Sequence, residues 1–211
     1  MTLPVDIHTH RPDLHPNAII SVTPREFAPE PHRYYSIGIH PWQSAEATPH
    51  DMELLEQMAS HPQVVAIGEC GIDRLQGAII ERQAEILVGH IDLSEKLQKP
   101  LILHIVRAYD LLLGIHKKMR PRQKWIIHGF RGNATTARQL IDAGCDLSYG
   151  EKYPCAALQA TPLDKLWIES DESTLPDNTL LTHIAEAYPC PTATLQASIA
   201  KRMKDVFFLK I

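Results

Sequence analysis

Residues 64–69 read Val64-Val65-Ala66-Ile67-Gly68-Glu69, an apolar run that ends in a glycine and a carboxylate. Short runs rich in valine and isoleucine are typical of strands buried on both faces of a parallel sheet. Comparable runs recur along the whole chain. The predicted strands are residues 5–9, 18–22, 34–39, 64–68, 101–104, 125–128, 146–148 and 166–169.

Segments with helical spacing separate the strands from the third strand onward. Residues 79–97 carry one apolar stripe, and residues 107–119 carry another. A third predicted helix begins at Asn133, a suitable N-cap, and stops at Gly144. Strands that alternate with helices predict an α/β fold, a TIM-type (β/α) barrel that fills residues 1–211 as one domain.

The N-terminal part of this barrel is expected to be trimmed and irregular. Residues 11–17 and 23–33 are rich in proline and too short for a regular helix. The helix that should follow the first strand is therefore missing. We find no repeat and no linker between domains in the sequence.

Composition narrows the class of protein. A net charge of −4 and a pI near 6.3 argue against a broad basic face that coats nucleic acid. No signal peptide and no membrane-spanning run are evident, so a cytoplasmic protein is expected. The four cysteines are far apart without a Cys-x-x-Cys pair, which favours buried free thiols over a thiolate metal site or disulfides.

Histidine and carboxylate residues mark the ends of several predicted strands. His8 and His10 are two residues apart, so both rings can face one side of a strand. A pair of this kind is weak evidence in a chain with 12 histidines, but its position at a strand end is shared by other candidates. The predicted metal ligands are His8, His10, Glu69, His104, His128 and Asp171.

The ligand types point to the kind of ion. The catalytic residues of barrel enzymes collect at the carboxyl ends of the strands. Imidazole and carboxylate ligands suit Zn²⁺ or Mn²⁺, and Mg²⁺ stays open. Six protein ligands exceed what one open catalytic zinc site uses, which favours two divalent ions that share a carboxylate.

The residues around these ligands resemble the TatD-like metal-dependent hydrolases, many of which are deoxyribonucleases. The likeness covers nearly the whole chain. It rests on His8-Thr9-His10, Gly38-Ile39-His40-Pro41-Trp42, Gly68-Glu69-Cys70-Gly71-Ile72-Asp73, His104, His128-Gly129-Phe130-Arg131-Gly132 and Glu169-Ser170-Asp171. The resemblance implies that His8, His10 and Asp171 hold one ion, that His104 and His128 hold the other, and that Glu69 bridges both.

Three departures from the family pattern affect the expected substrate cleft. The helix after the first strand is absent, Val106 stands where an arginine is usual, and Ser173 stands where a proline is usual. None of these changes removes a predicted ligand. They leave the choice of substrate open, because they alter the loops around the metals.

The expected reaction is hydrolysis by metal-activated water, with Asp171 and Glu69 as the catalytic carboxylates. The proposed substrate contacts are His40 and four arginines that follow strand ends, since arginine suits phosphate oxygens. These arginines are Arg11, Arg74, Arg107 and Arg131. Their alternative role is ordinary surface pairing with nearby Asp13, Asp73 and Asp110.

Several further side chains have both a functional and a structural interpretation. Trp42 can stack a nucleobase, or it can pack beside a hydrogen-bonded His40. Cys70 beside Glu69 is expected to pack in the core. The other histidines are expected to be surface or hydrogen-bonded helix residues: His15, His32, His50, His61, His90, His116 and His183.

Three functions are compatible with this pattern. The first is a deoxyribonuclease that cleaves DNA or another phosphodiester, and an exonuclease with a preference for single-stranded ends is what the resemblance implies. The second is a metal-dependent ester or amide hydrolase, which fits the acidic pI. The third is a metal-binding protein without catalysis. Oligomeric state is open.

Overall fold

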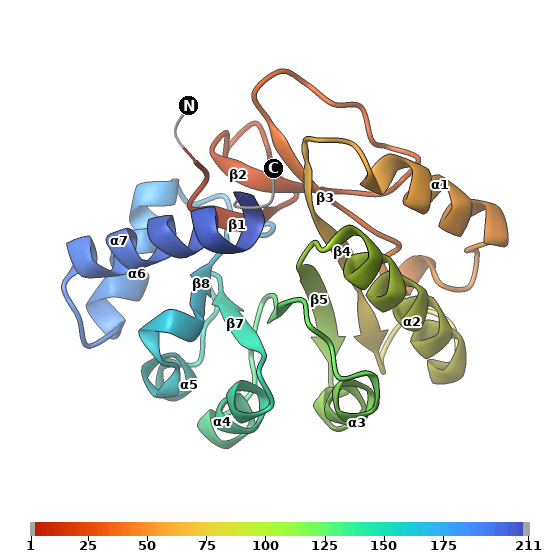
Figure 1. Cartoon of the computed structure of the whole chain (residues 1–211). Coiled ribbons are helices and arrows are strands. Elements are labelled where there is room, and N and C mark those ends of the chain that lie inside the picture. Colours follow the sequence, from red (N-terminus) through yellow and green to blue (C-terminus); the bar gives the residue numbers. More distant parts are fainter. Residues whose placement is uncertain (1–2, 209–211) are drawn as a thin grey trace. The chain divides into compact units, whose positions relative to one another are not determined.

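The computed structural model of the chain describes residues 3–208. Eight parallel strands follow one another in chain order in a closed barrel, which confirms the predicted TIM-like α/β fold. Figure 1 shows helices between successive strands of the later part of the chain. The strands are β1 (Asp6–Thr9), β2 (Ala18–Val22), β3 (Tyr34–Ile37), β4 (Val64–Asp73), β5 (Leu101–Val106), β6 (Trp125–Ile127), β7 (Asp146–Tyr149) and β8 (Leu166–Ile168).

Helices connect the strands from β3 onward, as the spacing of apolar residues predicts. They are η1 (Pro41–Gln43), α1 (Pro49–Ala59), α2 (Ile80–Leu97), α3 (Tyr109–Met119), α4 (Ala134–Asp142), α5 (Cys155–Ala160), η2 (Leu163–Lys165), α6 (Asp177–Ala187), α7 (Thr192–Met203) and η3 (Lys204–Phe208). Turns alone join β1 to β2 and β2 to β3, so the trimmed N-terminal part is confirmed. Within residues 3–208, none of the helices could cross a membrane.

The contacts within the chain define two compact units. The central unit comprises residues 21–126, and the terminal unit comprises residues 1–20 and 127–211. The predicted single domain stays a prediction, and each unit is described by itself below.

In the central unit, α2 covers β4 with its apolar stripe. Ile86, Leu87 and Ile91 of this helix are buried, as the period of the stripe predicts. Burial of large aliphatic side chains is the main favourable contribution to such packing. A capping box between Thr48 and Asp51 fixes the start of α1.

In the terminal unit, Trp167 of β8 is fully buried and contacts both Arg202 and Asp146. The guanidinium of Arg202 stacks over the Trp167 ring at 3.9 Å, and it pairs with buried Asp146 at 2.6 Å. The indole nitrogen of Trp167 also donates to Asp146, at 3.1 Å. Asn133 caps α4 by accepting the amide of Thr136 at 2.9 Å, as predicted.

Strand β4 is longer than predicted, and this changes the placement of Glu69. The prediction ended the strand at Gly68, whereas β4 continues to Asp73 and therefore contains Glu69. The register with β5 shifts between Ile67 and Cys70, and the pairing then resumes. Gly68 has a φ of +134°, and a Cβ there would overlap the carbonyl of Ile102. The predicted strand ended at Gly68. In the structure, Gly68 instead lies at a bulge within β4.

The cysteines are free thiols, as predicted, but they are not all buried. Cys70 and Cys145 lie in the core, whereas Cys155 is exposed at the start of α5 and Cys190 is partly exposed. The prediction of core packing for Cys70 is confirmed, and burial raises the pKa of its thiol well above the ordinary value. A thiol of this kind is not a nucleophile at neutral pH.

Candidate metal centres

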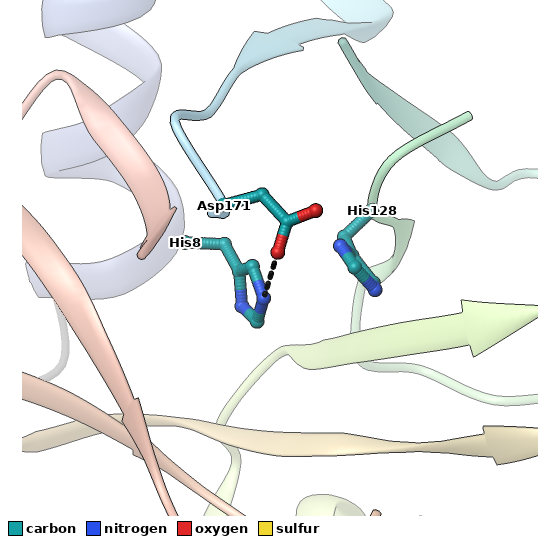
Figure 2. Close-up of side chains that lie close together, drawn as sticks. All are labelled: His8, His128 and Asp171. Atoms are coloured by element: carbon teal, nitrogen blue, oxygen red, sulfur yellow. Dashed lines mark ion pairs between the residues drawn. The ribbon is translucent and has the colours of Figure 1, made fainter. Parts of the chain in front are cut away.

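The terminal unit brings His8, His128 and Asp171 together, and we call these residues the terminal group. Their ligand atoms all lie within 4.8 Å of one another. The nearest approach joins His8 Nε2 to Asp171 Oδ1 at 3.8 Å, and the two imidazole centroids are 4.3 Å apart. Figure 2 shows the three side chains turned toward one another. Two imidazoles and one carboxylate are a suitable set of ligands for a divalent transition metal.

Backbone pairing between two segments places the members of the terminal group. His8 lies within β1, and the amide of Asp171 donates to its carbonyl at 2.9 Å. The amide of His10 in turn donates to the Asp171 carbonyl at 3.0 Å. His10 is exposed, and its ring stands edge-on to that of His8 at 4.8 Å. The pair of histidines and Asp171 are thus held by main-chain hydrogen bonds.

Asp6 is a buried carboxylate that is hydrogen-bonded to the backbone on either side of this group. It accepts the amide of His8 at 2.9 Å and the amide of Ser170 at 3.2 Å. Burial raises the pKa of Asp6 to about 7, although hydrogen bonds from Ser170 and His8 oppose the shift. Asp6 therefore anchors the two segments that carry His8 and Asp171.

Glu169 is a second buried carboxylate in the terminal unit. Its Oε1 accepts the amide of Gly129 at 2.5 Å and lies 3.3 Å from His128 Nδ1. Burial alone would raise the pKa of Glu169, but interactions with His128, His8 and Ser148 together outweigh it and lower the pKa. Glu169 therefore interacts with His128 as an ionised carboxylate.

The central unit brings together His40, Glu69 and His104, which we call the central group. His104 Nδ1 lies 2.7 Å from Glu69 Oε1, and His40 Nε2 lies 3.1 Å from the same oxygen. The ligand atoms of the three residues lie within 4.8 Å of one another. His40 was predicted to bind substrate, and here it has the geometry of a candidate ligand or of a partner to Glu69.

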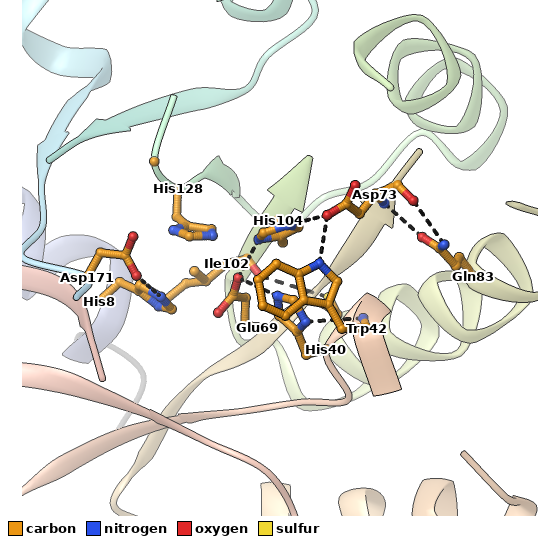
Figure 3. Close-up of polar contacts among 12 residues, drawn as sticks. His8, His40, Trp42, Glu69, Asp73, Gln83, Ile102, His104, His128 and Asp171 are labelled. Atoms are coloured by element: carbon orange, nitrogen blue, oxygen red, sulfur yellow. Dashed lines mark hydrogen bonds and ion pairs between the residues drawn. The ribbon is translucent and has the colours of Figure 1, made fainter. Parts of the chain in front are cut away.

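Asp73 is buried at the end of β4 and connects the central group to Trp42. Its Oδ2 accepts the indole N–H of Trp42 at 2.7 Å and lies 3.4 Å from His104 Nε2 (Figure 3). Its backbone amide donates to Gln83 of α2 at 2.7 Å. Burial would raise the pKa of Asp73, but hydrogen bonds from Trp42, Leu75 and His104 lower it below the ordinary value.

Trp42 combines the two interpretations made from the sequence. Its side chain is hydrogen-bonded to Asp73, and its ring stands edge-on to His40 at 4.8 Å and to His104 at 5.8 Å. The residue nevertheless remains 51% exposed, which is unusual for a fixed tryptophan. A face of the indole is therefore available to solvent beside the central group.

The arginines differ from one another more than the sequence suggested. Arg74 donates to Asp110 at 2.8 Å and to the Arg107 carbonyl at 2.7 Å, so its guanidinium is engaged. Arg74 thus makes the surface pair that was its alternative role, with Asp110 as the partner, whereas Asp73 turns toward Trp42. Asp73 is the buried last residue of β4, and Arg74 is the exposed residue that follows it. Arg11, Arg107 and Arg131 are exposed.

A hollow of about 100 Å³ opens beside Asp171 in the terminal unit. Arg131 and Lys152 line it together with Glu151 and Ser173. Ser173, which replaces the usual proline, donates its hydroxyl to Glu151 at 2.9 Å. The hollow therefore offers two cations next to the carboxylate of Asp171, which is partly exposed.

Two histidines outside the metal groups have structural roles. His90 of α2 is buried; its Nε2 accepts the amide of Ile39 at 2.9 Å, which requires Nδ1 to donate to the Ile86 carbonyl at 2.8 Å. Burial lowers its pKa to about 4. His15 lies in a turn and not in a helix, and it is buried against the Ser173 carbonyl at 2.9 Å. His15 was expected to be a surface or helix residue, and this expectation was wrong because the residue is buried in the segment between β1 and β2.

The sequence interpretation missed the roles of Asp73 and Glu169. Both stand inside the motifs that carry the family resemblance, directly after Ile72 and directly before Ser170. The signal was therefore present, but spacing alone does not show which carboxylate faces an imidazole.

Comparisons with known proteins agree with this description. The sequence profile described as TatD related DNase matches residues 21–204, a range that begins after His8 and His10. The chain is 32% identical over 151 residues to the metal-dependent hydrolase TatD of Mycobacterium tuberculosis, which covers 65% of this chain and 57% of that protein. It is 28% identical over 145 residues to the 3'-5' ssDNA/RNA exonuclease TatD of Erwinia tasmaniensis, covering 64% and 56% of the two proteins.

These matches span little more than half the length of the curated relatives. A solved structure extends the likeness in fold to nearly the whole chain. The TatD homologue YJJV of Escherichia coli K12 superposes with a TM-score of 0.83 at 22% identity, covering 97% of both chains.

Proposed function

Because the chain belongs to the TatD related DNase family, we propose that it is a divalent-metal-dependent hydrolase that cleaves phosphodiester bonds of DNA. The observation that carries the proposal is the pair of histidine and carboxylate groups, each with ligand atoms within 4.8 Å. Relatives that bear the name 3'-5' ssDNA/RNA exonuclease support action at strand ends.

The proposal retains the six predicted side chains as ligands of two divalent ions. Imidazole and carboxylate donors fit Zn²⁺ or Mn²⁺, and Mg²⁺ is the third candidate. The proposal also assigns to Glu69 the shared role between the ions that the family resemblance implies. When bound, such ions would lower the pKa of a coordinated water and polarise the phosphate. The proposed ligands are His8, His10, Glu69, His104, His128 and Asp171.

The side chains of the terminal unit have separate tasks in this reaction. Asp171 is partly exposed at the hollow and accepts the proton that the attacking water releases. Arg131 and Lys152 line the same hollow and can pair with phosphate oxygens. Water then adds to phosphorus, the bond to the leaving oxygen breaks, and the enzyme needs no covalent intermediate.

In the central unit, Trp42 and His40 are the proposed substrate contacts. The exposed indole of Trp42 can stack a nucleobase, because its N–H is already bonded to Asp73 and its face is free of that bond. His40 lies beside Glu69 and can donate to a phosphate or to the leaving oxygen. Arg11 and Arg107 are further candidates for contact with the substrate, whereas Arg74 is engaged by Asp110.

The test is hydrolysis of labelled oligonucleotides by protein loaded with Zn²⁺, Mn²⁺ or Mg²⁺. Single-stranded and duplex substrates, labelled at either end, report strand preference and the direction of cleavage. We expect mononucleotide release that a chelator stops and that Glu69→Gln abolishes. The matched control is Glu81→Gln, which changes an exposed glutamate of α2 and should leave the rate unaltered.

An ester or amide hydrolase with the same metals is the second candidate. It is favoured by the engagement of Arg74, which leaves fewer arginines for a phosphodiester than the sequence suggested. Turnover of an ester panel without release of nucleotides would select this function. Tight metal binding without turnover of either substrate would identify a binding protein without catalysis.

A further inference from the structure

Two buried carboxylates stand next to histidines of the metal groups without belonging to the proposed ligand set. Asp73 is 2% exposed and lies beside His104, and Glu169 is 0% exposed and lies beside His128. A buried carboxylate is costly unless it is paired and hydrogen-bonded, so each position calls for an explanation.

Asp73 is held rigidly by contacts that do not depend on an ion. Its Oδ1 accepts the amide of Leu75 at 2.7 Å, and its Oδ2 accepts the indole N–H of Trp42 at 2.7 Å. Gln83 accepts the backbone amide of Asp73 and donates to its carbonyl at 3.0 Å. The carboxylate is thus fixed at both oxygens and at its main chain.

This placement gives the Nε2 side of the His104 ring a hydrogen-bond acceptor. Oδ2 of Asp73 faces His104 Nε2 at 3.4 Å (Figure 3). A neutral imidazole has a single N–H, and Nδ1 of His104 also faces a carboxylate oxygen, Oε1 of Glu69, at 2.7 Å. A divalent ion held by Nδ1 and Glu69 would need the lone pair of Nδ1, so the hydrogen would then lie on Nε2, where Asp73 accepts it.

Glu169 is likewise an acceptor for a ring nitrogen of His128, but here the nitrogen is Nδ1. Its Oε1 lies 3.3 Å from His128 Nδ1, and the amide of Gly129 holds this oxygen at 2.5 Å. A hydrogen on Nδ1 leaves the lone pair of His128 on Nε2. The two units therefore provide two carboxylate–histidine pairs, one through Nε2 and one through Nδ1.

We propose that Asp73 and Glu169 are positioning residues that fix the tautomers of His104 and His128, so that Nδ1 of His104 and Nε2 of His128 are the metal-binding atoms. The proposal rests on the proposed metal-dependent function. Carboxylates behind a ligating histidine orient the ring and make it a better donor, and their loss typically weakens metal binding by about 10- to 100-fold.

The tautomers can be observed directly in the wild-type protein. Long-range ¹H–¹⁵N spectra of the metal-free and Zn²⁺-loaded protein distinguish a protonated ring nitrogen from a bare one. We expect a hydrogen on Nε2 of His104 and on Nδ1 of His128 in the loaded protein. The reverse assignment for either ring would overturn the proposal for that residue, and this measurement requires no variant.

Metal affinity supplies the second readout, measured by competition with a chromophoric chelator. The asparagine of Asp73→Asn has one oxygen, so it cannot accept from Leu75 and from His104 at the same time. Glu169→Gln loses the charge that faces His128. Each should weaken Zn²⁺ binding by about 10- to 100-fold. Asp110→Asn is the matched control for Asp73, because it makes the same change at an exposed aspartate of α3 that pairs with Arg74. It should change affinity by less than about threefold.

The outcomes separate this inference from the proposed function. Unchanged affinity in folded Asp73→Asn and Glu169→Gln would overturn the positioning roles, whatever the activity. Weakened affinity in a protein that cleaves no oligonucleotide would support the positioning roles and contradict the nuclease. A wild-type protein that binds no divalent ion would overturn both, and circular dichroism identifies a variant that fails to fold.

Discussion

The terminal and central groups contain the same kinds of ligand, but they are held in different ways. In the central group, Glu69 and His104 lie on the adjacent strands β4 and β5, His40 precedes η1, and a single oxygen of Glu69 contacts both histidines. Asp73, Trp42 and Gln83 support it from behind. The terminal group has side chains from β1 and from the segments after β6 and β8, and its ion pair between His8 Nε2 and Asp171 Oδ1 is 3.8 Å long. The ligand atoms of the central group therefore contact one another directly, whereas those of the terminal group are farther apart and are placed mainly through the main chain.

This contrast suggests a division of labour. A rigid group keeps its geometry at little cost when an ion or substrate arrives. A looser group next to an open hollow can adjust as the substrate reacts, which suits a proton acceptor such as Asp171. The predictions below test this division.

The largest effect is expected from the looser group. Asp171→Asn removes the proposed proton acceptor and should lower kcat by about 10²- to 10⁴-fold, with a smaller change in KM. Single-turnover cleavage of a labelled oligonucleotide measures the chemical step. Asp142→Asn, at an exposed aspartate of α4 in the same unit, should leave the rate unaltered. A loss in kcat of less than tenfold in the Asp171 variant would show that another group accepts the proton.

The rigidity of the central group can be broken by adding one methyl group. Gly71 has a φ of +152°, and a Cβ there would overlap the backbone carbonyl of His104. Gly71→Ala should destabilise the protein by about 3 kcal/mol through strain and displacement of β5. Urea denaturation measures this change in the free energy of unfolding.

Gly114→Ala is the matched control for this substitution. Gly114 lies on exposed α3, and a Cβ there meets no atom within 4 Å. The helix should gain about 0.5–1 kcal/mol from the lower entropy of the unfolded chain. Equal effects of the two alanines would contradict the close approach of β4 and β5.

The fold was predictable because its signal is repeated along the chain. The β-branched runs of all eight strands and the cap at Asn133 are local features, and each indicates its own element. Strand ends were less predictable. Gly68 is a residue that normally ends strands, and only the pairing of Cys70 with Leu103 shows that β4 continues past Glu69.

The metal ligands were predictable as residue types, but their supporting contacts were not. The choice of Asp110 over Asp73 as the partner of Arg74 depends on burial, because Asp73 is buried and bonded to Trp42 whereas Arg74 is exposed. Distant neighbours such as Trp42 and Asp73 are 31 positions apart, and no local pattern indicates their contact. The burial of His15 against Ser173 likewise depends on chain segments far apart in sequence.

The central unit should also contribute a particular pH dependence through His90. Burial lowers the pKa of this histidine to about 4, whereas the unfolded chain titrates near 6.5. The unfolded state therefore binds more protons between these values, and stability falls as pH decreases from 6.5 toward 4. Between pH 7 and pH 5 the loss should be about 2 kcal/mol.

Urea denaturation at the two pH values, with His90→Gln as the variant, isolates this contribution. The glutamine has no charge to acquire, so the variant should lose about 2 kcal/mol less than the wild type over the same interval. His50→Gln, at an exposed position of α1, should follow the wild type. Parallel curves for wild type and His90→Gln would contradict the buried neutral imidazole.

The smallest effects are expected from the arginines, and they compare the two units directly. Arg131 lines the hollow beside Asp171, whereas Arg74 is engaged by Asp110 and by a backbone carbonyl. A cation that pairs with a phosphate of a single strand contributes about 0.7 to the slope of log affinity against log salt concentration. Arg131→Gln should reduce the magnitude of this negative slope by about 0.7.

Arg74→Gln serves as the comparison, because it breaks an exposed pair that is worth at most about 1 kcal/mol to stability. Binding of a fluorescent single-stranded oligonucleotide to the metal-loaded Asp171→Asn protein, at several salt concentrations, measures both slopes without cleavage. The slope for Arg74→Gln should equal that of the parent. A larger change for Arg74→Gln than for Arg131→Gln would move the phosphate contact from the terminal unit to the central unit, because only an arginine that displaces counterions on binding changes the slope.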